Sequence, residues 1–230
     1  MSKNRILTIE QIKESENQFI CKNSEEQLLN IAGEKIAIFL LNKFKKKTLL
    51  FVCGKGNNGQ DGVKASIFLG EKIKNKVFSV PKNYSKKNLN TLQSNIKSHE
   101  IIVDCLFGTG LNRPLSKFHQ KIIEIINKSQ KKIISIDIPS GLNSDTGQPL
   151  GSSVIAHMTI CMGFYKPAHF LIPSKNYCGD KVLLKLPLKI PLKITPKIHL
   201  LKKDKVCNSF PKHKNSISKY DKGHVVVIGG

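Results

Sequence analysis

The 230-residue sequence lacks the features of a metal-clustered, secreted or membrane-spanning protein. Its six cysteines are widely spaced, with no C-x-x-C pair, and no histidines stand at the spacing of a zinc site. Cysteines of this kind are expected to stay reduced, which predicts a cytoplasmic protein. The N-terminus has no apolar signal core and no apolar run is long enough to cross a membrane, so we expect no membrane association.

Acidic residues are also scarce, at 16 against 38 lysines and arginines, for a formal net charge of +22. Lysine greatly outnumbers arginine, and no aromatic RNA-binding motif accompanies the positive charge. This composition favours lysines spread over solvated faces rather than nucleic-acid binding. A general attraction for small molecules that carry phosphate still follows.

Strand-like and helix-like stretches alternate along the chain. Capping sequences at Thr8 and Ser24 predict an N-terminal pair of helices over residues 8–19 and 24–44. Strands are expected near residues 48–53, 77–80, 101–107, 133–137, 154–162 and 182–186, with helices over 63–69, 89–96 and 118–127. The alternation predicts an α/β, Rossmann-like three-layer fold with a mostly parallel sheet and helices on both faces.

A glycine-rich stretch, residues 54–62, connects the first of these strands to a helix. Gly54, Gly56 and Gly59 fit the pattern G-x-G-x-x-G, and we expect the glycines to adopt left-handed dihedrals and seat a phosphate at the helix start. A nicotinamide dehydrogenase usually carries an acidic residue after the next strand. Here that strand is followed by Pro81 and Lys82, which argues against an ordinary dehydrogenase.

Two more strands end in unusual chemistry. Asp104 begins the segment 104–114, and Asp137 begins the segment 137–147. Taken singly, Asp137 has an alternative explanation as a turn or capping residue, and Asp104 as the partner of a lysine. The polar residues of the three segments could equally serve only loop hydrogen bonds and solvated turns. Because the carboxyl ends of parallel strands meet at one edge of a sheet, their convergence favours a ligand site there.

Together these segments resemble the NAD(P)H-hydrate epimerase family, the N-terminal domain of bacterial nicotinamide-nucleotide repair proteins. The family sequences G-x-G-N-N-G-G-D-G, D-x-L-F-G-T-G-L-x-R-P and D-I-P-S-G-L-x-x-D-T-G match residues 54–62, 104–114 and 137–147. Gln60 replaces one family glycine, and would strain the loop if that position needs a positive φ. In a fourth element, residues 159–169, Ala168 replaces another glycine.

The resemblance implies an isomerase that interconverts the R and S forms of hydrated NADH and NADPH (NADHX and NADPHX), a step of metabolite repair. It implies Asp137 as the acid/base, with Lys166 as a second candidate, and a potassium ion with the side-chain ligands Asn58, Asp104 and Ser140. The implied substrate-binding residues are Asn57, Asn58, Gly59, Gln60, Asp61, Gly108, Thr109, Gly110, Leu111, Asn112, Arg113, Pro114 and Asp137.

The C-terminal part differs in character. Residues 187–196 read as a linker, and residues 219–230 resemble the opening of an ADP- or ATP-dependent NAD(P)H-hydrate dehydratase domain, with an extra terminal strand as the alternative. We therefore expect an epimerase domain over residues 1–204. Residues 205–230 would be a linker and the first strand of a truncated, ribokinase-like dehydratase domain, the partner in a full-length bifunctional chain.

Two questions stay open at this point. The sequence leaves a homodimer possible without deciding it. A non-catalytic nucleotide- or RNA-binding scaffold of the same fold is the alternative function, because fold alone does not give activity.

Overall fold

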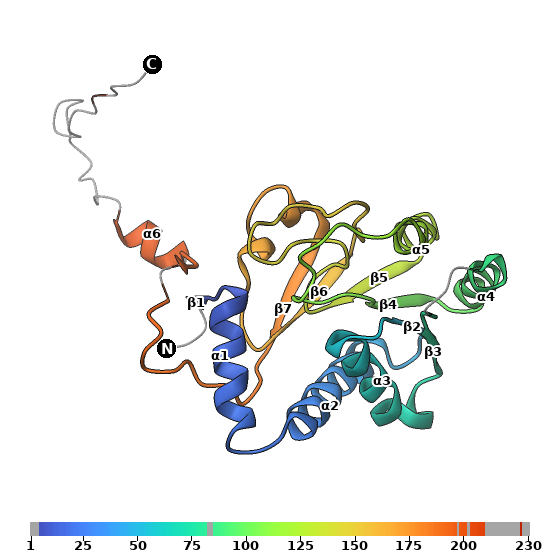
Figure 1. The fold of residues 1–230 in the computed structure, drawn as a ribbon, viewed down its shortest axis with the longest axis horizontal. Helices are drawn as coiled ribbons and strands as arrows, with labels where there is room; N and C mark the ends of the chain where they lie inside the picture. The colour runs from blue at the N-terminus through green and yellow to red at the C-terminus, as the bar shows by residue number, and fades with distance from the viewer. Residues whose placement is uncertain (1–4, 82–84, 197, 202, 210–225, 227–230) are drawn as a thin grey trace, which may run out of the picture.

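The computed structural model describes residues 5–81, 85–196, 198–201, 203–209 and 226, and its centre is a six-stranded parallel sheet (Figure 1). The strand order is β3-β2-β4-β5-β6-β7. The strands are β2 (Leu49–Cys53), β3 (Asn75–Ser79), β4 (Ile101–Cys105), β5 (Lys132–Ile136), β6 (Met158–Met162) and β7 (Asp180–Leu184). Every residue of β2, β4 and β6 is buried, as expected for strands covered on both faces.

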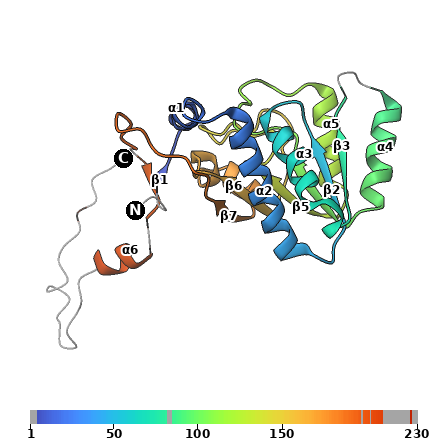
Figure 2. The ribbon, with the colours of Figure 1, turned by 90° about the horizontal axis from the view of Figure 1, so that it is seen from below.

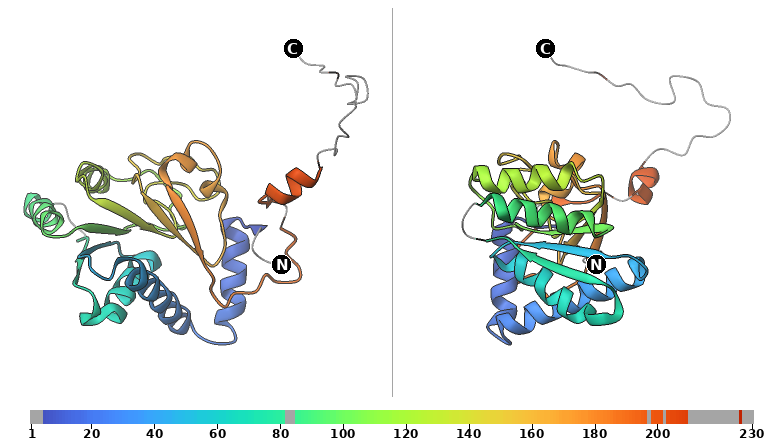
Figure 3. Two further views of the ribbon diagram at one scale, coloured as in Figure 1. Left: turned by 180° about the vertical axis from the view of Figure 1, so that it is seen from behind. Right: turned by 90° about the vertical axis from the view of Figure 1, so that its right-hand side faces the viewer.

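Helices cover both faces of the sheet and confirm the three-layer prediction. On one face lie α2 (Glu25–Phe44) and α3 (Asn57–Leu69), and on the other α4 (Lys86–Lys97) and α5 (Lys117–Asn127), as the right-hand view of Figure 3 shows. Two large apolar clusters fill the two interfaces. Short 3-10 helices complete the chain at Gly70–Lys72, Pro167–His169 and Ser174–Tyr177. No helix of the described residues is long and apolar enough to span a membrane.

The N-terminal helix α1 (Ile9–Ile20) stands apart from the α2 and α3 layer (Figures 1 and 2). Thr8 forms the predicted capping box, and Ser24 caps α2 as predicted. Leu7 and Ile12 pack with Phe164 in a small separate apolar cluster. This small cluster therefore holds α1 against the edge of the domain.

Two strands and one α-helix have no counterpart in the sequence prediction. Strands β1 (Arg5–Ile6) and β8 (Ile198–His199) pair in a small antiparallel sheet beside α1, and α6 (Lys203–Ser209) follows. Strands of two residues are too short to give a hydrophobic period. Most of the predicted dehydratase segment, including all of 219–230 except Val226, lies outside the described residues.

The strand order reverses next to β2. The chain passes from β2 outward to β3, then returns to β4 on the other side of β2. Open α/β sheets bind ligands at the carboxyl ends of strands beside such a reversal. The three predicted strand ends belong to β2, β4 and β5, which are neighbours in the sheet. Their convergence is thus confirmed.

The glycine-rich stretch differs from its prediction. Helix α3 already begins at Asn57. None of the four glycines in residues 54–62 has a positive φ, so the prediction of left-handed dihedrals is wrong. A Cβ at Gly54 would lie 2.0 Å from the carbonyl oxygen of Leu106, and one at Gly59 would lie 2.0 Å from that of Gly54. These glycines let the start of α3 pack against the strand ends. Gln60 sits inside the helix without a positive φ, so the strain considered for it does not arise.

This packing predicts that Gly54→Ala destabilises the domain by about 1–3 kcal/mol, because the clashing atom is backbone and cannot rotate away. Gly110→Ala is the matched control, since nothing lies within 4 Å of its added Cβ and its φ is not positive. Denaturant unfolding should place the control within about 0.5 kcal/mol of the unsubstituted protein. Equal stability of the two variants would contradict the packing role of Gly54.

Candidate functional site

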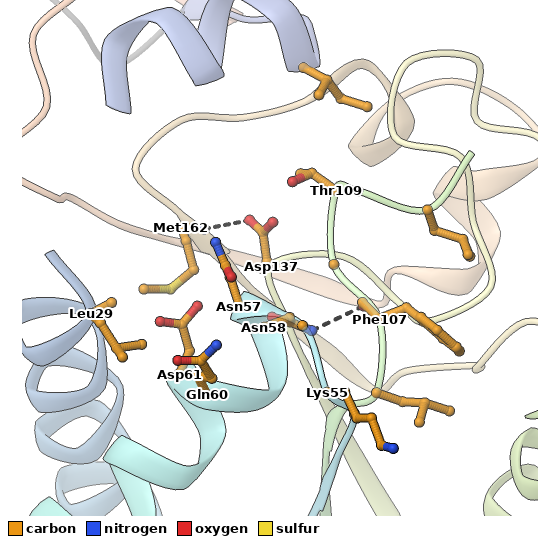
Figure 4. A pocket seen from close by; sticks show the side chains of 18 of the residues that line it. Leu29, Lys55, Asn57, Asn58, Gln60, Asp61, Phe107, Thr109, Asp137 and Met162 are labelled. Carbon is orange, nitrogen blue, oxygen red and sulfur yellow. Dashed lines mark hydrogen bonds between the residues drawn. The ribbon is translucent and has the colours of Figure 1, made fainter. Parts of the chain in front are cut away.

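A cavity of about 660 Å³ opens at the carboxyl ends of β2, β4 and β5 (Figure 4). Its size is that of a typical small-molecule site. Eleven of the thirteen predicted substrate-binding residues line it; they are Asn57, Asn58, Gln60, Asp61, Gly108, Thr109, Gly110, Leu111, Asn112, Arg113 and Asp137. Gly59 and Pro114 do not line the cavity.

The backbone of Asp137 is held in a conformation that non-glycine residues seldom adopt. Its φ is 66°, and Gln130 is the only other non-glycine residue of the described chain with a positive φ. The Asp137 N–H donates to the carbonyl oxygen of Ile160 at 2.7 Å, and its own carbonyl oxygen lies 2.8 Å from His169 Nε2. Backbone strain that hydrogen bonds to the surrounding structure hold in place is typical of functional positions.

Lys166 supplies the charge that faces Asp137. Its ammonium forms an ion pair with Asp137 Oδ1 and donates to the carbonyl oxygen of Met162 at 2.9 Å, with only 1% of the residue exposed. The Met162 N–H also reaches Asp137 Oδ1, at 3.3 Å. The carboxylate is therefore paired and oriented, while Asp137 still lines the cavity.

His169 acts as a neutral support for this pair. Burial, and then the charge of Lys166, lower the pKa of His169 to about 4. Its Nδ1 accepts from the Lys166 N–H at 3.0 Å, which leaves Nε2 as the protonated nitrogen that donates to the Asp137 carbonyl oxygen. Ala168, beside it, is fully buried without a positive φ, so alanine fits where the family usually has glycine.

Two more carboxyl groups reach the same cavity. Burial, and then the charges of Asp137 and Glu16, raise the pKa of Asp61 to about 8. The pKa of Glu16, on α1, is raised by burial and then by the charge of Asp137. At neutral pH, Asp61 thus keeps its proton beside a carboxylate that is paired with lysine.

Behind the cavity, Asp104 is fully buried and bonded by protein donors. The Ser140 Oγ donates to Oδ1 at 2.6 Å; Ser135 Oγ and the Ser140 N–H donate to Oδ2 at 2.8 and 3.0 Å; the Leu106 N–H reaches Oδ1 at 3.2 Å. No lysine or arginine of the described chain pairs with it. Burial raises the pKa of Asp104. Protein donors therefore satisfy the Asp104 carboxyl group, and its surroundings do not by themselves require a cation.

Asn58 gives a different indication of a cation. Its Nδ2 donates to the carbonyl oxygen of Phe107 at 3.0 Å, whereas its buried Oδ1 has no hydrogen-bond partner. The Phe107 N–H in turn donates to Ser140 Oγ at 2.8 Å, which joins Asn58 to the Asp104 cluster. The atoms of Asn58, Asp104 and Ser140 that could bind a cation are all oxygens, which are the ligands that a hard cation requires. Among the described residues, no group of three histidine, cysteine or acidic residues could hold a metal.

The cavity lining also includes basic side chains. Lys55 and Arg113 line the cavity beside the turn 108–112, together with His119. Burial, and then the charge of Arg113, lower the pKa of His119, so this imidazole is neutral at physiological pH. The cavity thus presents both carboxyl groups and cations to a ligand.

Sequence reasoning missed one wall of the cavity. Helix α1 contributes Ile12, Lys13 and Glu16, and α2 contributes Leu28 and Leu29. The only available signal was the pairing of Lys13 and Glu16 three residues apart beside apolar positions, which is common on any amphipathic helix. It gave no reason to place α1 at the carboxyl edge of the sheet.

The fold and the site define a Rossmann-like α/β protein with a carboxyl-lined ligand cavity at the strand-order reversal. The family model described as "YjeF-related protein N-terminus" matches residues 25–97 and 79–168. The chain belongs to this family.

Named relatives agree with that assignment. The chain is 31% identical over 192 residues to an NAD(P)H-hydrate epimerase of Elusimicrobium minutum, covering 71% of this chain and 86% of the relative. It is 31% identical over 253 residues to a bifunctional NAD(P)H-hydrate repair enzyme Nnr of Dictyoglomus turgidum, covering 98% of this chain and 49% of the relative. The chain therefore spans about half the length of that bifunctional relative.

A solved structure shares the fold. The crystal structure of yeast ynu0, YNL200c, aligns with a TM-score of 0.64 at 21% identity, covering 78% of this chain and 87% of the yeast chain. At that identity the likeness supports the fold alone.

Proposed function

We propose that this chain is an isomerase that interconverts the R and S forms of hydrated NADH and NADPH. The relatives named as NAD(P)H-hydrate epimerases support the reaction, and the cavity supports the ligand class. The observation that carries the proposal is Asp137, strained at φ 66°, paired with a buried lysine and exposed to the cavity. A scaffold has no need of such an arrangement.

The polarity of the cavity predicts how the substrate lies. The hydrated nicotinamide ring belongs within reach of Asp137. The phosphates belong near Lys55, Arg113 and the first turn of α3, where cations and helix N–H groups favour negative charge. The excess of lysine over the whole chain would add a general attraction for this anionic substrate.

The chemistry asks for a positioned acid/base. The hydrated carbon bears both a hydroxyl group and the ring nitrogen, so its configuration inverts when one of its bonds breaks and re-forms. Such a step needs proton transfer, to which a positioned carboxyl group typically contributes about 10²- to 10⁴-fold. Asp137 is the residue we assign to it, with Lys166 and His169 as positioning residues that hold its side chain and backbone.

Asn58, Asp104 and Ser140 fit a potassium ion. The partnerless Oδ1 of Asn58 is the feature that supports it, since an oxygen buried without a donor is costly unless a cation or water meets it. Potassium there would add positive charge beside Asp104 and tie the start of α3 to the segments that follow β4 and β5.

A melting experiment tests the ion. We expect potassium chloride to raise the melting temperature by a few degrees relative to tetramethylammonium chloride, because an ion at about ten times its Kd stabilises the folded state by about 1.4 kcal/mol. Asn58→Ala should remove the difference, whereas Asn23→Ala, an exposed asparagine in the turn before α2, should keep it. An equal change in melting temperature in all three proteins would contradict a potassium ion bound at Asn58.

The domain division stays a proposal. The alignment with the bifunctional relative covers nearly the whole chain, which supports a continuation into a dehydratase domain after residue 204. The cytoplasmic location follows from the sequence reasoning alone.

The reaction itself is tested with the purified chain and one isolated epimer of hydrated NADH. We expect the protein to convert this epimer to the equilibrium mixture of epimers at a rate far above that in buffer. Chromatography measures the conversion. Binding of the epimer without faster conversion would favour the scaffold alternative.

A further inference from the structure

Asp137 is one of two aspartates that enter the cavity from different elements. Asp61 projects from the second turn of α3, whereas Asp137 follows β5; Figure 4 shows both carboxyl groups directed into the same space, with Asn57 and Met162 beside them. Neither lies on the wall that carries the other. A ligand ring between these walls can therefore meet a carboxyl group on each side.

Inversion of a carbon in a ring that the protein holds still is easier with a proton donor and a proton acceptor on opposite faces. A group leaves from one face, and its replacement arrives at the other. A single carboxyl group serves both faces only if the ring turns over between the two events. The cavity lining favours a fixed ring, because phosphates at Lys55 and Arg113 would anchor the dinucleotide.

We propose that Asp61 is the second catalytic residue, which protonates the departing hydroxyl group while Asp137 accepts a proton from the incoming water. This inference rests on the proposed function. The ring nitrogen lone pair forms a carbon–nitrogen double bond as the carbon–oxygen bond breaks, and the oxygen leaves as water with the proton of Asp61. A water molecule then attacks from the other face, the double bond electrons return to nitrogen, and Asp137 takes the proton that the water loses.

The atoms and charges balance without any further reagent. One water molecule is released and one is taken up in each inversion, and one proton moves from Asp61 to Asp137. Exchange with solvent restores the starting protonation, and the two aspartates exchange roles in the opposite direction. The scheme is therefore a two-carboxyl inversion that incorporates solvent oxygen.

The charges around Asp61 suit this role. The groups that face it are Glu16 of α1, Asp137 at the end of β5 and Lys166 after β6. Burial together with the two carboxylates raises the pKa of Asp61 to about 8, which keeps it a proton donor at neutral pH. The lysine pairs with Asp137 and not with Asp61, so Asp61 lacks the direct ion pair that would favour its ionised form.

The test compares Asp61→Asn with the unsubstituted protein. Asparagine has the shape of a protonated aspartic acid and still donates and accepts hydrogen bonds, but it cannot release a proton. We expect epimerisation to fall about 10²-fold with little change in melting temperature. Asp61→Glu should restore part of the rate, and Asp180→Asn, an exposed aspartate at the start of β7, should leave it unchanged.

The same assay in ¹⁸O-labelled water checks the chemistry. Each inversion by the unsubstituted protein should place one ¹⁸O atom in the product hydroxyl group, after subtraction of the uncatalysed reaction, and the rate should decline as the pH rises past about 8. An unlabelled product, or full activity of Asp61→Asn, would overturn the inference while leaving the epimerase proposal standing. No activity in the unsubstituted protein would instead refute the proposed function itself.

Discussion

Asp137→Asn is expected to slow the epimerisation of hydrated NADH by about 10²- to 10⁴-fold while the chain still folds. Asparagine is the right replacement because it tolerates a positive φ better than alanine does, and the backbone at position 137 has a φ of 66°. The hydrogen bonds of the backbone to Ile160 and His169 can then persist. The substitution removes the proton acceptor and also leaves the Lys166 ammonium without its charged partner, which lowers stability.

The measurement is the rate of interconversion of one purified epimer, with Asp180→Asn as the matched control. The control replaces an exposed aspartate at the other end of the sheet by the same residue type. If Asp137→Asn keeps the full rate, Asp137 is not the acid/base, whatever the strain of its backbone indicates.

Lys166→Met is expected to lower the free energy of unfolding by about 3–5 kcal/mol, since removal of one partner leaves the other charge buried and unpaired. Lys166 is 1% exposed and Asp137 is 9% exposed, so water can compensate little. Methionine fills a similar volume and leaves the carbonyl oxygen of Met162 without its donor. We also expect epimerisation to be lost, because the ammonium no longer holds the Asp137 carboxylate in place.

A double-mutant cycle separates these two effects. The double variant Asp137→Asn with Lys166→Met contains neither charge, so it should recover much of the stability that each single variant loses. It should remain inactive. Additive losses of stability in urea unfolding would show that Asp137 and Lys166 do not act as a pair.

Much of this architecture could be predicted because its causes are local. Thr8 and Ser24 begin helices through side-chain caps, and the buried parallel strands read as apolar runs. The predicted strand over 154–162 begins only at Met158, because an apolar run does not distinguish a strand from the buried loop before it. The alternation of strands and helices then predicts a mostly parallel sheet that is covered on both faces.

The location of the site could be predicted from the sequence, whereas the partners of its charged residues could not. Asp104 and Asp137 stood out because a carboxylate at the end of a buried strand needs a reason. Which partner each one has depends on tertiary contacts: four protein donors surround Asp104, and a lysine 29 residues away meets Asp137. No local pattern reports these distances.

The glycines of residues 54–62 show the same limit. Their pattern predicted left-handed dihedrals around a phosphate, whereas Gly54 closely approaches the chain itself at Leu106 and none of these glycines has a positive φ. The contribution of Glu16 was invisible for a related reason, since the position of α1 is set by contacts of Leu7 and Ile12 with Phe164, far along the chain.

The most direct test is the interconversion rate of a single purified epimer of hydrated NADH with the unsubstituted protein, with Asp137→Asn and without protein. The account predicts rapid approach to the epimer equilibrium with the unsubstituted protein, and a rate for Asp137→Asn that is at least about 10²-fold lower. A rate with the unsubstituted protein equal to that in buffer would contradict it.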